Sequence, residues 1–344
     1  MKKITLGSTD ITVPQNAFGA LPIQRVDIDT AVSILRRAYD GGMRLFDTAR
    51  AYSNSEEKIG KAFFEGYVKR EDVVITTKTT AKNPDDFRKD LDTSLKMLQT
   101  DYIDVYQFHM MGQCYRPDDG TGMYECMLEA KRQGKIRHIG GTAHKIGIAE
   151  ELATSGLYET VQYPISYLAD ERETDLIRLC NDNNVGVICM KGLAGGLVTD
   201  SRAAMAFVGQ FDGTVAIWGI QRDEELTEWL SYMDDTPVMD DAIRSFIESE
   251  KKELSGEFCR GCGYCMPCTV GIQINQCNRM ALMLRRAPSA SWLSEYWQGE
   301  MKKAEDCIEC GSCLPKCPYG LDIPKLLKKN IADYKEVLAG NRPV

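Results

Sequence analysis

The chain has 344 residues, of which 43% are hydrophobic and 27% are charged, and these values are ordinary for a globular protein with a sizeable core. Its formal net charge of −8 disfavours a surface that binds nucleic acid or an anionic membrane. No apolar run approaches the roughly 20 residues of a membrane span, and the opening MKKITLGSTDITVP lacks the apolar core of a signal peptide. We therefore expect a cytoplasmic protein that contacts neither nucleic acid nor membrane.

Short β-rich runs alternate with helical patterns up to about residue 220. This alternation indicates parallel strand–helix–strand units, and several runs are apolar almost throughout, as expected of strands buried on both faces. Eight such units fit a (β/α)8 barrel, which takes about 250 residues. A doubly wound sheet is disfavoured because no G-x-G-x-x-G follows the first run. The expected strands end near Ala20, Asp47, Lys78, His109, Gly141, Ser166, Met190 and Gly219.

Two further β-rich runs, KKITL and ITVP, precede the first barrel strand. We expect them to form a hairpin across the turn at Gly7–Asp10 and to close one end of the barrel. Residues 223–255 are charged and helical, and this pattern ends at Gly256, where a cysteine-rich region begins. We place a domain boundary there, after residue 255.

Nine of the 13 cysteines lie between residues 259 and 317. An expected reducing compartment disfavours disulfides and favours metal ligation. The first run is C-x2-C-x2-C-x2-C from Cys259, and the second is C-x2-C-x2-C-x3-C-P from Cys307, which is the bacterial ferredoxin run. Zinc sites instead pair two C-x2-C units across a spacer, and four cysteines at three-residue steps crowd one tetrahedral ion. The spacing therefore predicts iron–sulfur clusters.

The two cysteine runs are followed by the same short pattern. Gly, an aliphatic residue and Ile recur three, four and six positions after Cys268 and after Cys317. In ferredoxin runs of this type the fourth cysteine ligates the other cluster, so a duplicated half-domain predicts two [4Fe–4S] clusters with crossed ligands. Thr269 follows Cys268 where Pro is usual, so Cys277 is kept as an alternative ligand. The predicted sets are Cys259, Cys262, Cys265 and Cys317 for the first cluster, and Cys307, Cys310, Cys313 and Cys268 for the second.

These patterns predict an α/β chain in which residues 1–255 form a (β/α)8 TIM barrel with an N-terminal β-hairpin, followed at 256–344 by a small, mainly helical ferredoxin-like domain. In such a barrel, function lies at the carboxyl ends of the strands. Four ionisable residues on three adjacent strand ends or in the loop after one of them indicate a catalytic site there, although each alone has an ordinary structural explanation. These residues are Asp47, Tyr52, Lys78 and His109.

The stretch FDTARAYSNSEEKIGKAF and the order of these four residues resemble the aldo-keto reductase superfamily. The phrases CGYCMPC and MK-x-LAGG are similar to its subgroup fused to a C-terminal two-cluster 4Fe–4S ferredoxin-type domain. The resemblance implies an oxidoreductase in which Tyr52 protonates a carbonyl oxygen while a nicotinamide delivers hydride. Lys78, held by Asp47, would lower the pKa of Tyr52. His109 would orient or polarise the carbonyl.

The resemblance also implies a nucleotide site beyond the fifth to eighth strands. Gln162 matches the residue that bonds the nicotinamide amide, and backbone amides after the seventh strand suit a pyrophosphate. Arg222 either binds the 2′-phosphate of NADP or pairs with the three acids that follow it, so NADP and NAD both stay open. The predicted cofactor residues are Thr142, Gln162, Met190, Lys191, Leu193, Gly219 and Arg222.

Two functional hypotheses follow from these patterns. In the first, the protein reduces a small-molecule carbonyl, or oxidises an alcohol, with NAD(P)(H), and its clusters carry single electrons or are structural. In the second, the protein is an electron-transfer module whose barrel binds a ligand or partner, and whose clusters relay electrons to a redox partner protein without nicotinamide. The loop after the eighth strand motivates the second hypothesis because it lacks the family's usual nucleotide-binding pattern.

Overall fold

The computed structural model describes residues 1–254, 258–286 and 289–344. The chain divides into two compact units, the first made of Met1–Gly192 and Arg202–Asp240 and the second of Leu193–Ser201 and Asp241–Val344. The predicted boundary after residue 255 falls in 255–257, outside the described residues. Over the described ranges, no helix combines the length and the apolar character that crossing a bilayer requires.

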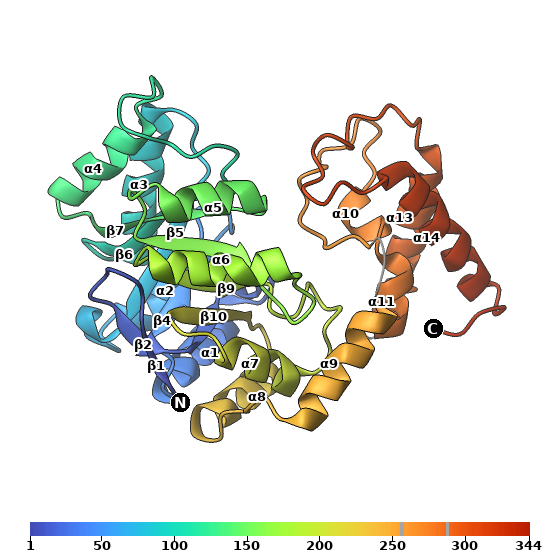
Figure 1. Cartoon of the computed structure of the whole chain (residues 1–344), viewed down its shortest axis with the longest axis horizontal. Coiled ribbons are helices and arrows are strands. Elements are labelled where there is room, and N and C mark those ends of the chain that lie inside the picture. The colour runs from blue at the N-terminus through green and yellow to red at the C-terminus, as the bar shows by residue number, and fades with distance from the viewer. Residues whose placement is uncertain (255–257, 287–288) are drawn as a thin grey trace. The chain divides into compact units, whose positions relative to one another are not determined.

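The first unit is built on a closed barrel of eight parallel strands in the order β10-β3-β4-β5-β6-β7-β8-β9 (Figure 1). The predicted (β/α)8 architecture is confirmed, and each strand ends within two residues of its expected position. The barrel closes where β10 pairs with β3, with Trp218 opposite Phe18. The strands are β3 (Asn16–Gly19), β4 (Leu45–Asp47), β5 (Val74–Thr79), β6 (Ile103–Phe108), β7 (Ile136–Thr142), β8 (Thr160–Pro164), β9 (Gly186–Met190) and β10 (Thr214–Gly219).

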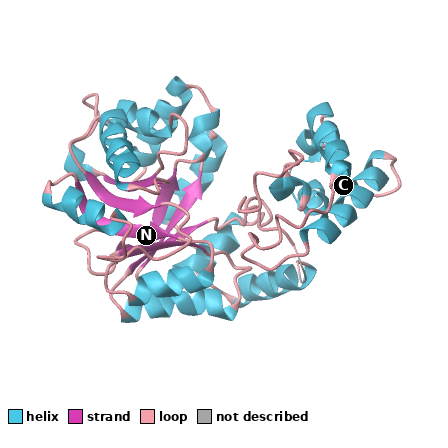
Figure 2. Cartoon of the chain, turned by 90° about the horizontal axis from the view of Figure 1, so that it is seen from above, coloured by secondary structure: helices cyan, strands magenta, loops and turns pink. Residues whose placement is uncertain are grey.

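Helices follow the barrel strands and surround them (Figure 2). The helix α1 (Ile28–Asp40) is capped by the carboxylate of Asp27 and buries one apolar face. The helix α3 (Pro84–Leu98) starts with proline after the Asn83 cap and ends at Gln99 in the left-handed region. The other helices of this part of the chain are η1 (Pro22–Arg25), α2 (Ser55–Phe63), η2 (Arg70–Asp72), α4 (Met123–Arg132), α5 (Ile146–Thr154), α6 (Glu171–Asp182), α7 (Ser201–Gly209) and α8 (Asp223–Asp234).

The N-terminal hairpin closes one end of the barrel, as predicted. Its strands β1 (Lys3–Thr5) and β2 (Thr12–Pro14) pair in antiparallel register. Gly7 in the turn has a φ of +53°, and a Cβ there would lie 2.3 Å from the amide nitrogen of Gly186, so the turn requires glycine. The hairpin shares one apolar cluster with the barrel interior, made of Ile4, Leu6, Ile11, Val13, Ala17, Leu45, Val105, Ile188, Val215 and Ile217.

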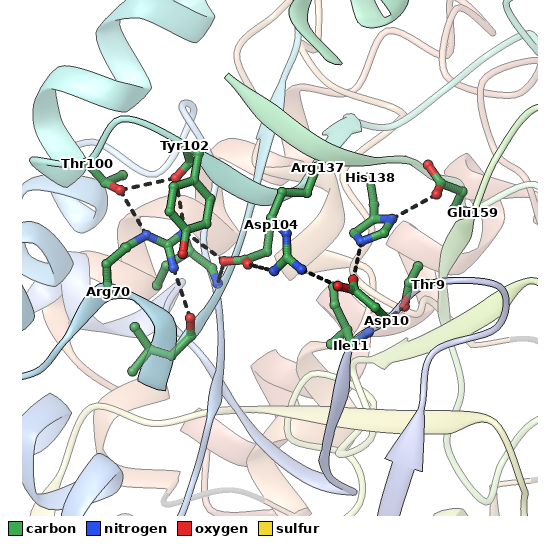
Figure 3. Close-up of polar contacts among 12 residues, drawn as sticks. Thr9, Asp10, Ile11, Arg70, Thr100, Tyr102, Asp104, Arg137, His138 and Glu159 are labelled. Atoms are coloured by element: carbon green, nitrogen blue, oxygen red, sulfur yellow. Dashed lines mark hydrogen bonds and ion pairs between the residues drawn. The ribbon is translucent and has the colours of Figure 1, made fainter. Parts of the chain in front are cut away.

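A network of ion pairs ties the end of the hairpin turn to the barrel strands (Figure 3). Arg137 and His138, neighbours on β7, both contact the carboxylate of Asp10. His138 Nδ1 lies 2.8 Å from Glu159 Oε1, so the imidazole sits between two carboxylates. Arg137 Nη1 donates to Asp104 Oδ1 at 2.7 Å and extends the network to β6. Every charged group in this network therefore faces a charge of opposite sign.

The second unit, in its described part, consists of helices and loops and contains no strand (Figure 2). This agrees with the predicted small, mainly helical domain. Its longest helix is α14, which is capped at Asp322 and carries a proline in its first turn. The helices are α9 (Asp241–Glu253), α10 (Ile274–Cys277), α11 (Met280–Arg286), α12 (Ser289–Trp292), α13 (Glu295–Lys303), η3 (Ala304–Asp306) and α14 (Ile323–Leu338).

The sequence repeat after the two cysteine runs is also a repeat of backbone conformation. Gly271 and Gly320 have φ angles of +76° and +62°, in the left-handed region. Three residues later, Ile274 begins α10 and Ile323 begins α14. The two halves of the cysteine region thus follow the same turn into a helix, which supports the interpretation as a duplicated half-domain.

Candidate active site and cysteine cavities

The four predicted catalytic residues meet at the carboxyl ends of three neighbouring barrel strands. Asp47 is the last residue of β4, Lys78 lies near the end of β5, and His109 directly follows β6. These strands are adjacent and parallel, so their ends share one edge of the barrel. Tyr52 lies in the loop that leads from β4 to α2. The structure therefore brings all four together, as the sequence predicted.

Lys78 and Asp47 form a fully buried ion pair. The Lys78 ammonium nitrogen lies 2.7 Å from each oxygen of the Asp47 carboxylate, and the two side chains are 1% and 3% exposed. The ammonium also donates to the Thr48 carbonyl at 2.7 Å, and the Thr76 hydroxyl donates to Asp47 Oδ2 at 2.6 Å. Burial lowers the pKa of Lys78, and the charge of Asp47 opposes that change. The chain itself therefore supplies hydrogen-bond partners to both charged groups.

Tyr52 lies beside this pair and against His109. The rings of Tyr52 and His109 meet edge to face, with centroids 5.6 Å apart and an interplanar angle of 81°. The Lys78 ammonium lies 5.4 Å from the centre of the Tyr52 ring. The expected lowering of the Tyr52 pKa is not found in this structure, because burial and then the negative charge of Asp47 raise that pKa. Desolvation of the phenol is the larger of these two causes.

His109 is held in its neutral form. Burial first, and then the positive charges of Lys78, Lys82 and Lys191, lower its pKa to about 3. Its Nδ1 is buried and has no hydrogen-bond partner in the described part of the chain. His144, in the loop after β7, is also buried, and its pKa is lowered to about 2 by burial, Lys191 and His109. At neutral pH the barrel end therefore presents uncharged imidazoles, which can donate or accept a hydrogen bond.

Two of the predicted cofactor residues lie close to this group. Gln162 on β8 places its Nε2 3.5 Å from Asp47 Oδ1, and its Oε1 accepts a hydrogen bond from Gln107 Nε2 at 2.9 Å. The hydroxyl of Thr142, at the end of β7, accepts from the Met110 amide at 2.7 Å, which leaves its own O–H able to donate. Gln107 was not predicted, although its place two residues before His109 puts both residues on one face of a strand.

The remaining predicted cofactor residues are more scattered. Met190 and Gly219 end β9 and β10, and Lys191 follows Met190 with a φ of +56°. Leu193, in contrast, belongs to the second compact unit. Arg222 is 64% exposed and its guanidinium donates to Glu225 Oε1 at 2.7 and 2.9 Å. Of the two interpretations of Arg222, the structure favours pairing with the acids that follow it.

The cysteines of the two runs line two cavities in the second unit. The first cysteine cavity also contains Arg260, Asn278 and Tyr319, and the second contains Thr269, Glu309 and Ser312. Within the described ranges, no three His, Cys, Asp or Glu side chains are arranged to hold a single metal ion. The first cavity is lined by Cys259, Cys262, Cys265 and Cys317, and the second by Cys265, Cys268, Cys307, Cys310 and Cys313.

Each cavity is lined by the four cysteines of one predicted crossed set. Cys317 from the second run lies with three cysteines of the first run, and Cys268 from the first run lies with three of the second. Cys265 borders both cavities, as do Ile274 and Ile323, the first residues of α10 and α14. Cys277 borders neither; it is fully buried, and its thiol lies 3.9 Å from the Glu300 carbonyl.

Three features of these cavities fit iron–sulfur clusters. The Gly261 amide donates to Cys259 Sγ at 3.4 Å, and the Thr269 hydroxyl lies 3.5 Å from Cys310 Sγ; hydrogen bonds to sulfur of this kind accompany clusters. The side chain of Asn278 in the first cavity is buried, and neither its oxygen nor its nitrogen has a partner in the described part of the chain. Such an amide requires a partner that the described residues do not supply.

Residues 4–238 match the aldo/keto reductase family. The chain belongs to this family. Residues 258–322 match a 4Fe-4S dicluster domain, so an aldo/keto reductase barrel is fused to an iron–sulfur domain, as the sequence patterns indicated.

The matches to curated relatives cover about half of this chain. The aldo-keto reductase YhdN of Bacillus subtilis is 36% identical over 195 residues, which are 53% of this chain and 58% of YhdN. An NADH-specific methylglyoxal reductase of Escherichia coli is 32% identical over 231 residues, 58% of this chain and 69% of that enzyme. The match thus extends over little more than half of the YhdN sequence.

Solved structures show the same fold. The aldo-keto reductase AKR11C1 of Bacillus halodurans superposes with a TM-score of 0.62 at 22% identity, covering 73% of this chain and 96% of its own. An aldo-keto reductase of Klebsiella pneumoniae, solved in complex with NADPH, gives 0.62 at 22% identity and covers 72% and 95%. At this identity the likeness establishes the barrel fold.

Proposed function

We propose that the protein reduces a small-molecule carbonyl, or oxidises the corresponding alcohol, with NAD(P)(H) at the end of its barrel. The observation that carries this proposal is the convergence of Tyr52 and His109 beside the closed Lys78–Asp47 pair. A nicotinamide, when bound, supplies or accepts the hydride. The relatives named for methylglyoxal reduction suggest small carbonyl substrates.

The proton step falls to Tyr52. Its phenol is protonated at neutral pH and can donate that proton, while its raised pKa makes it a weaker acid than a free tyrosine. His109, which is neutral, donates a hydrogen bond to the carbonyl oxygen and directs it toward the phenol. The adjacent Lys78 ammonium stabilises negative charge that develops on the phenol oxygen as its proton leaves. Asp47 holds that ammonium in place through both of its oxygens.

The nicotinamide end of the cofactor has donors and acceptors ready in the barrel. Gln162 offers an amide near Asp47, and Thr142, paired with Gln162 on the neighbouring strand, offers a hydroxyl. The opposite end of the nucleotide has less support, because Arg222 is exposed and bonded to Glu225. We therefore propose nicotinamide binding through the barrel end, with no strong selection for a 2′-phosphate.

The cysteines complete the proposal. Cys259, Cys262, Cys265 and Cys317 would hold one [4Fe–4S] cluster, and Cys307, Cys310, Cys313 and Cys268 the other. Each cluster transfers single electrons, whereas hydride carries two, so the clusters are proposed to exchange electrons with a redox partner protein of the cell.

The test uses anaerobically purified full-length protein with its iron in place. Carbonyl reduction by NADH and NADPH is measured over a panel of aldehydes and ketones for the wild type and for Tyr52→Phe. We expect Tyr52→Phe to lower kcat by about 10²–10⁴-fold because general acid catalysis is lost. Tyr67→Phe is the matched control, since Tyr67 donates to Asp40 at the barrel surface. Unchanged turnover in Tyr52→Phe for every accepted carbonyl would refute the proposal.

The electron-transfer module without nicotinamide is the second candidate. The engagement of Arg222 by Glu225 favours it, because the loop then offers no free cation to a 2′-phosphate. The same protein is titrated with NADH and NADPH while the cluster absorbance is followed. Saturable nicotinamide binding together with carbonyl turnover supports the reductase, whereas cluster reduction by a protein partner with no nicotinamide binding supports the module.

A further inference from the structure

Two buried polar residues stand beside the first cysteine cavity, outside the barrel chemistry. Asn278 and Arg279 join α10 to α11, and they are 2% and 6% exposed. Residues of this polarity are seldom buried without a partner. Their immediate neighbours in space are the cysteine loop at Cys259–Cys262 and the segment around Gly195.

The Asn278 amide is the unsatisfied group. Its side chain lines the first cysteine cavity, and neither Oδ1 nor Nδ2 has a hydrogen-bond partner in the described residues. Its backbone carbonyl accepts from Asn330 Nδ2 at 3.0 Å, so its position is fixed from behind. Leaving a buried amide unmatched costs free energy. Acceptor atoms on the cavity side, such as the sulfurs of a cluster, would satisfy its N–H donors.

Arg279 supplies a buried positive charge next to the same cavity. Its guanidinium donates to the Gly195 carbonyl at 2.7 Å and to Gln276 Oε1 at 3.2 Å, both neutral acceptors. A Cβ at Gly261 would lie 2.7 Å from Arg279 Nη1, so the guanidinium rests against the loop between Cys259 and Cys262. Among the described residues it has no carboxylate partner, and its charge acts on Cys259. An Arg side chain stays protonated in proteins.

We propose that Asn278 and Arg279 tune the first [4Fe–4S] cluster toward its reduced state. The amide donates a hydrogen bond to a sulfur of the cluster, and the guanidinium provides a fixed positive charge. One-electron reduction adds a negative charge to a cluster, and both net charge and hydrogen bonds to sulfur set its potential. The inference rests on the proposed ligand set, in which Cys259 and Cys317 hold this cluster.

The second cavity makes the proposal specific. In the described residues its lining contains no Arg or Lys, and its one charged side chain is Glu309, which pairs with Lys328. Removing Asn278 or Arg279 should therefore move the potential of one cluster and leave the other as an internal reference.

The experiment is a redox titration of anaerobic full-length holoprotein with dithionite, followed by electron paramagnetic resonance. Cys317→Ser identifies the signal of the first cluster. Arg279→Gln should shift that cluster's reduced-to-oxidised ratio at least tenfold toward the oxidised form, equivalent to 59 mV for one electron. Asn278→Leu, which keeps the volume and removes the donor, should shift it several-fold in the same direction.

Two controls separate charge from packing. Arg279→Lys keeps the charge and should restore a potential close to that of the wild type. Arg285→Gln removes a guanidinium of α11 that pairs with Asp333 of α14, and should leave both potentials unchanged. Gln276→Glu keeps Arg279 in place and places a carboxylate at the contact that Gln276 already makes with the guanidinium. This negative charge offsets that of Arg279, so the potential of the first cluster should fall. The variant therefore tests the charge even if Arg279→Gln fails to fold.

The outcomes distinguish this inference from the proposed function. Asn278 also borders a more open cavity with Phe258 and Leu326. The competing role for its amide is to bind water from that cavity, and in that case Asn278→Leu would leave the potential of the first cluster unchanged. If Gln276→Glu and Asn278→Leu retain both clusters, with unchanged iron content and absorbance, and the first potential does not move, the inference is overturned. If wild-type protein holds no cluster on Cys259 and Cys317, the proposed ligand set itself fails.

Discussion

Asp47 and Lys78 in the barrel and Asn278 in the second unit are all almost fully buried polar side chains, yet they are satisfied in different ways. The barrel pair is closed within the chain by hydrogen bonds of 2.7 Å. The Asn278 amide has no partner in the described residues. The Lys78–Asp47 pair thus finds its partners as the polypeptide folds, whereas the cysteine cavities are completed by what they bind. We therefore expect the fold of the barrel to survive loss of its nicotinamide, and the fold of the second unit to be destabilised by loss of its clusters.

Loss of a cluster is the largest expected effect. Because a metal site supplies folding free energy only when filled, Cys317→Ala should remove the first cluster and expose the loops around Cys259 and Cys262. We expect amide protection there to fall by roughly 100-fold, while the barrel strands keep theirs. Hydrogen exchange with mass spectrometry measures both regions in one sample.

The matched control for this prediction is Cys277→Ala. Cys277 is equally a cysteine of the second unit, but it borders neither cavity. It should keep full iron content and full protection of the cysteine loops. Loss of iron from Cys277→Ala, with Cys268→Ala retaining it, would reassign the last ligand and contradict the crossed set.

The closed pair of the barrel can be broken directly. Lys78→Met leaves the Asp47 carboxylate buried without its cation, so we expect a loss of about 3–5 kcal/mol in the free energy of unfolding of the barrel. The double variant Asp47→Asn, Lys78→Met should recover much of that loss, because the two residues are coupled. Urea unfolding followed by hydrogen exchange of β4 and β5 peptides checks both. If the losses in unfolding free energy of the two single variants add up in the double variant, Asp47 and Lys78 do not interact as described.

The network around the hairpin turn gives a smaller, pH-dependent test (Figure 3). Burial opposes ionisation of Glu159, but its contacts with His138, Lys131 and the Ile139 amide lower its pKa to about 2. A carboxyl whose pKa is depressed on folding stabilises the fold above its unfolded pKa, near 4.5, and that stabilisation is lost as the pH falls toward 2. Glu159→Gln should therefore reduce by about 1–3 kcal/mol the stability lost between pH 5 and pH 2. Exposed Glu57→Gln should leave that pH dependence unchanged.

The barrel and its catalytic group could be predicted because they follow from periodicity. Apolar runs and helical spacing fix where strands end, and parallel strands bring Asp47, Lys78 and His109 to one edge. The repeat after Cys268 and Cys317 likewise predicted which cysteines share a cavity. These features depend on spacing along the chain, which the sequence states directly.

Other features depend on burial, which spacing does not give. The raised pKa of Tyr52 follows first from desolvation and then from the charge of Asp47, so the expected lowering of that pKa was wrong. Gln107 could be assigned to the candidate active site only from the structure, which shows its hydrogen bond to Gln162. The unsatisfied amide of Asn278 becomes visible only after the surrounding chain has been placed. In each case a three-dimensional neighbour, absent from any local motif, decides the chemistry.

Substitution of Arg222 is expected to have the smallest effect, on the choice between NADPH and NADH. Its guanidinium is exposed and already bonded to Glu225, and exposed pairs contribute about 0–1 kcal/mol. Arg222→Ala should therefore change the ratio of kcat/KM for NADPH and NADH by less than about fivefold. Glu225→Gln is the matched variant because it frees the same guanidinium. A tenfold loss of NADPH selectivity in Arg222→Ala would show instead that Arg222 leaves Glu225 to bind the 2′-phosphate.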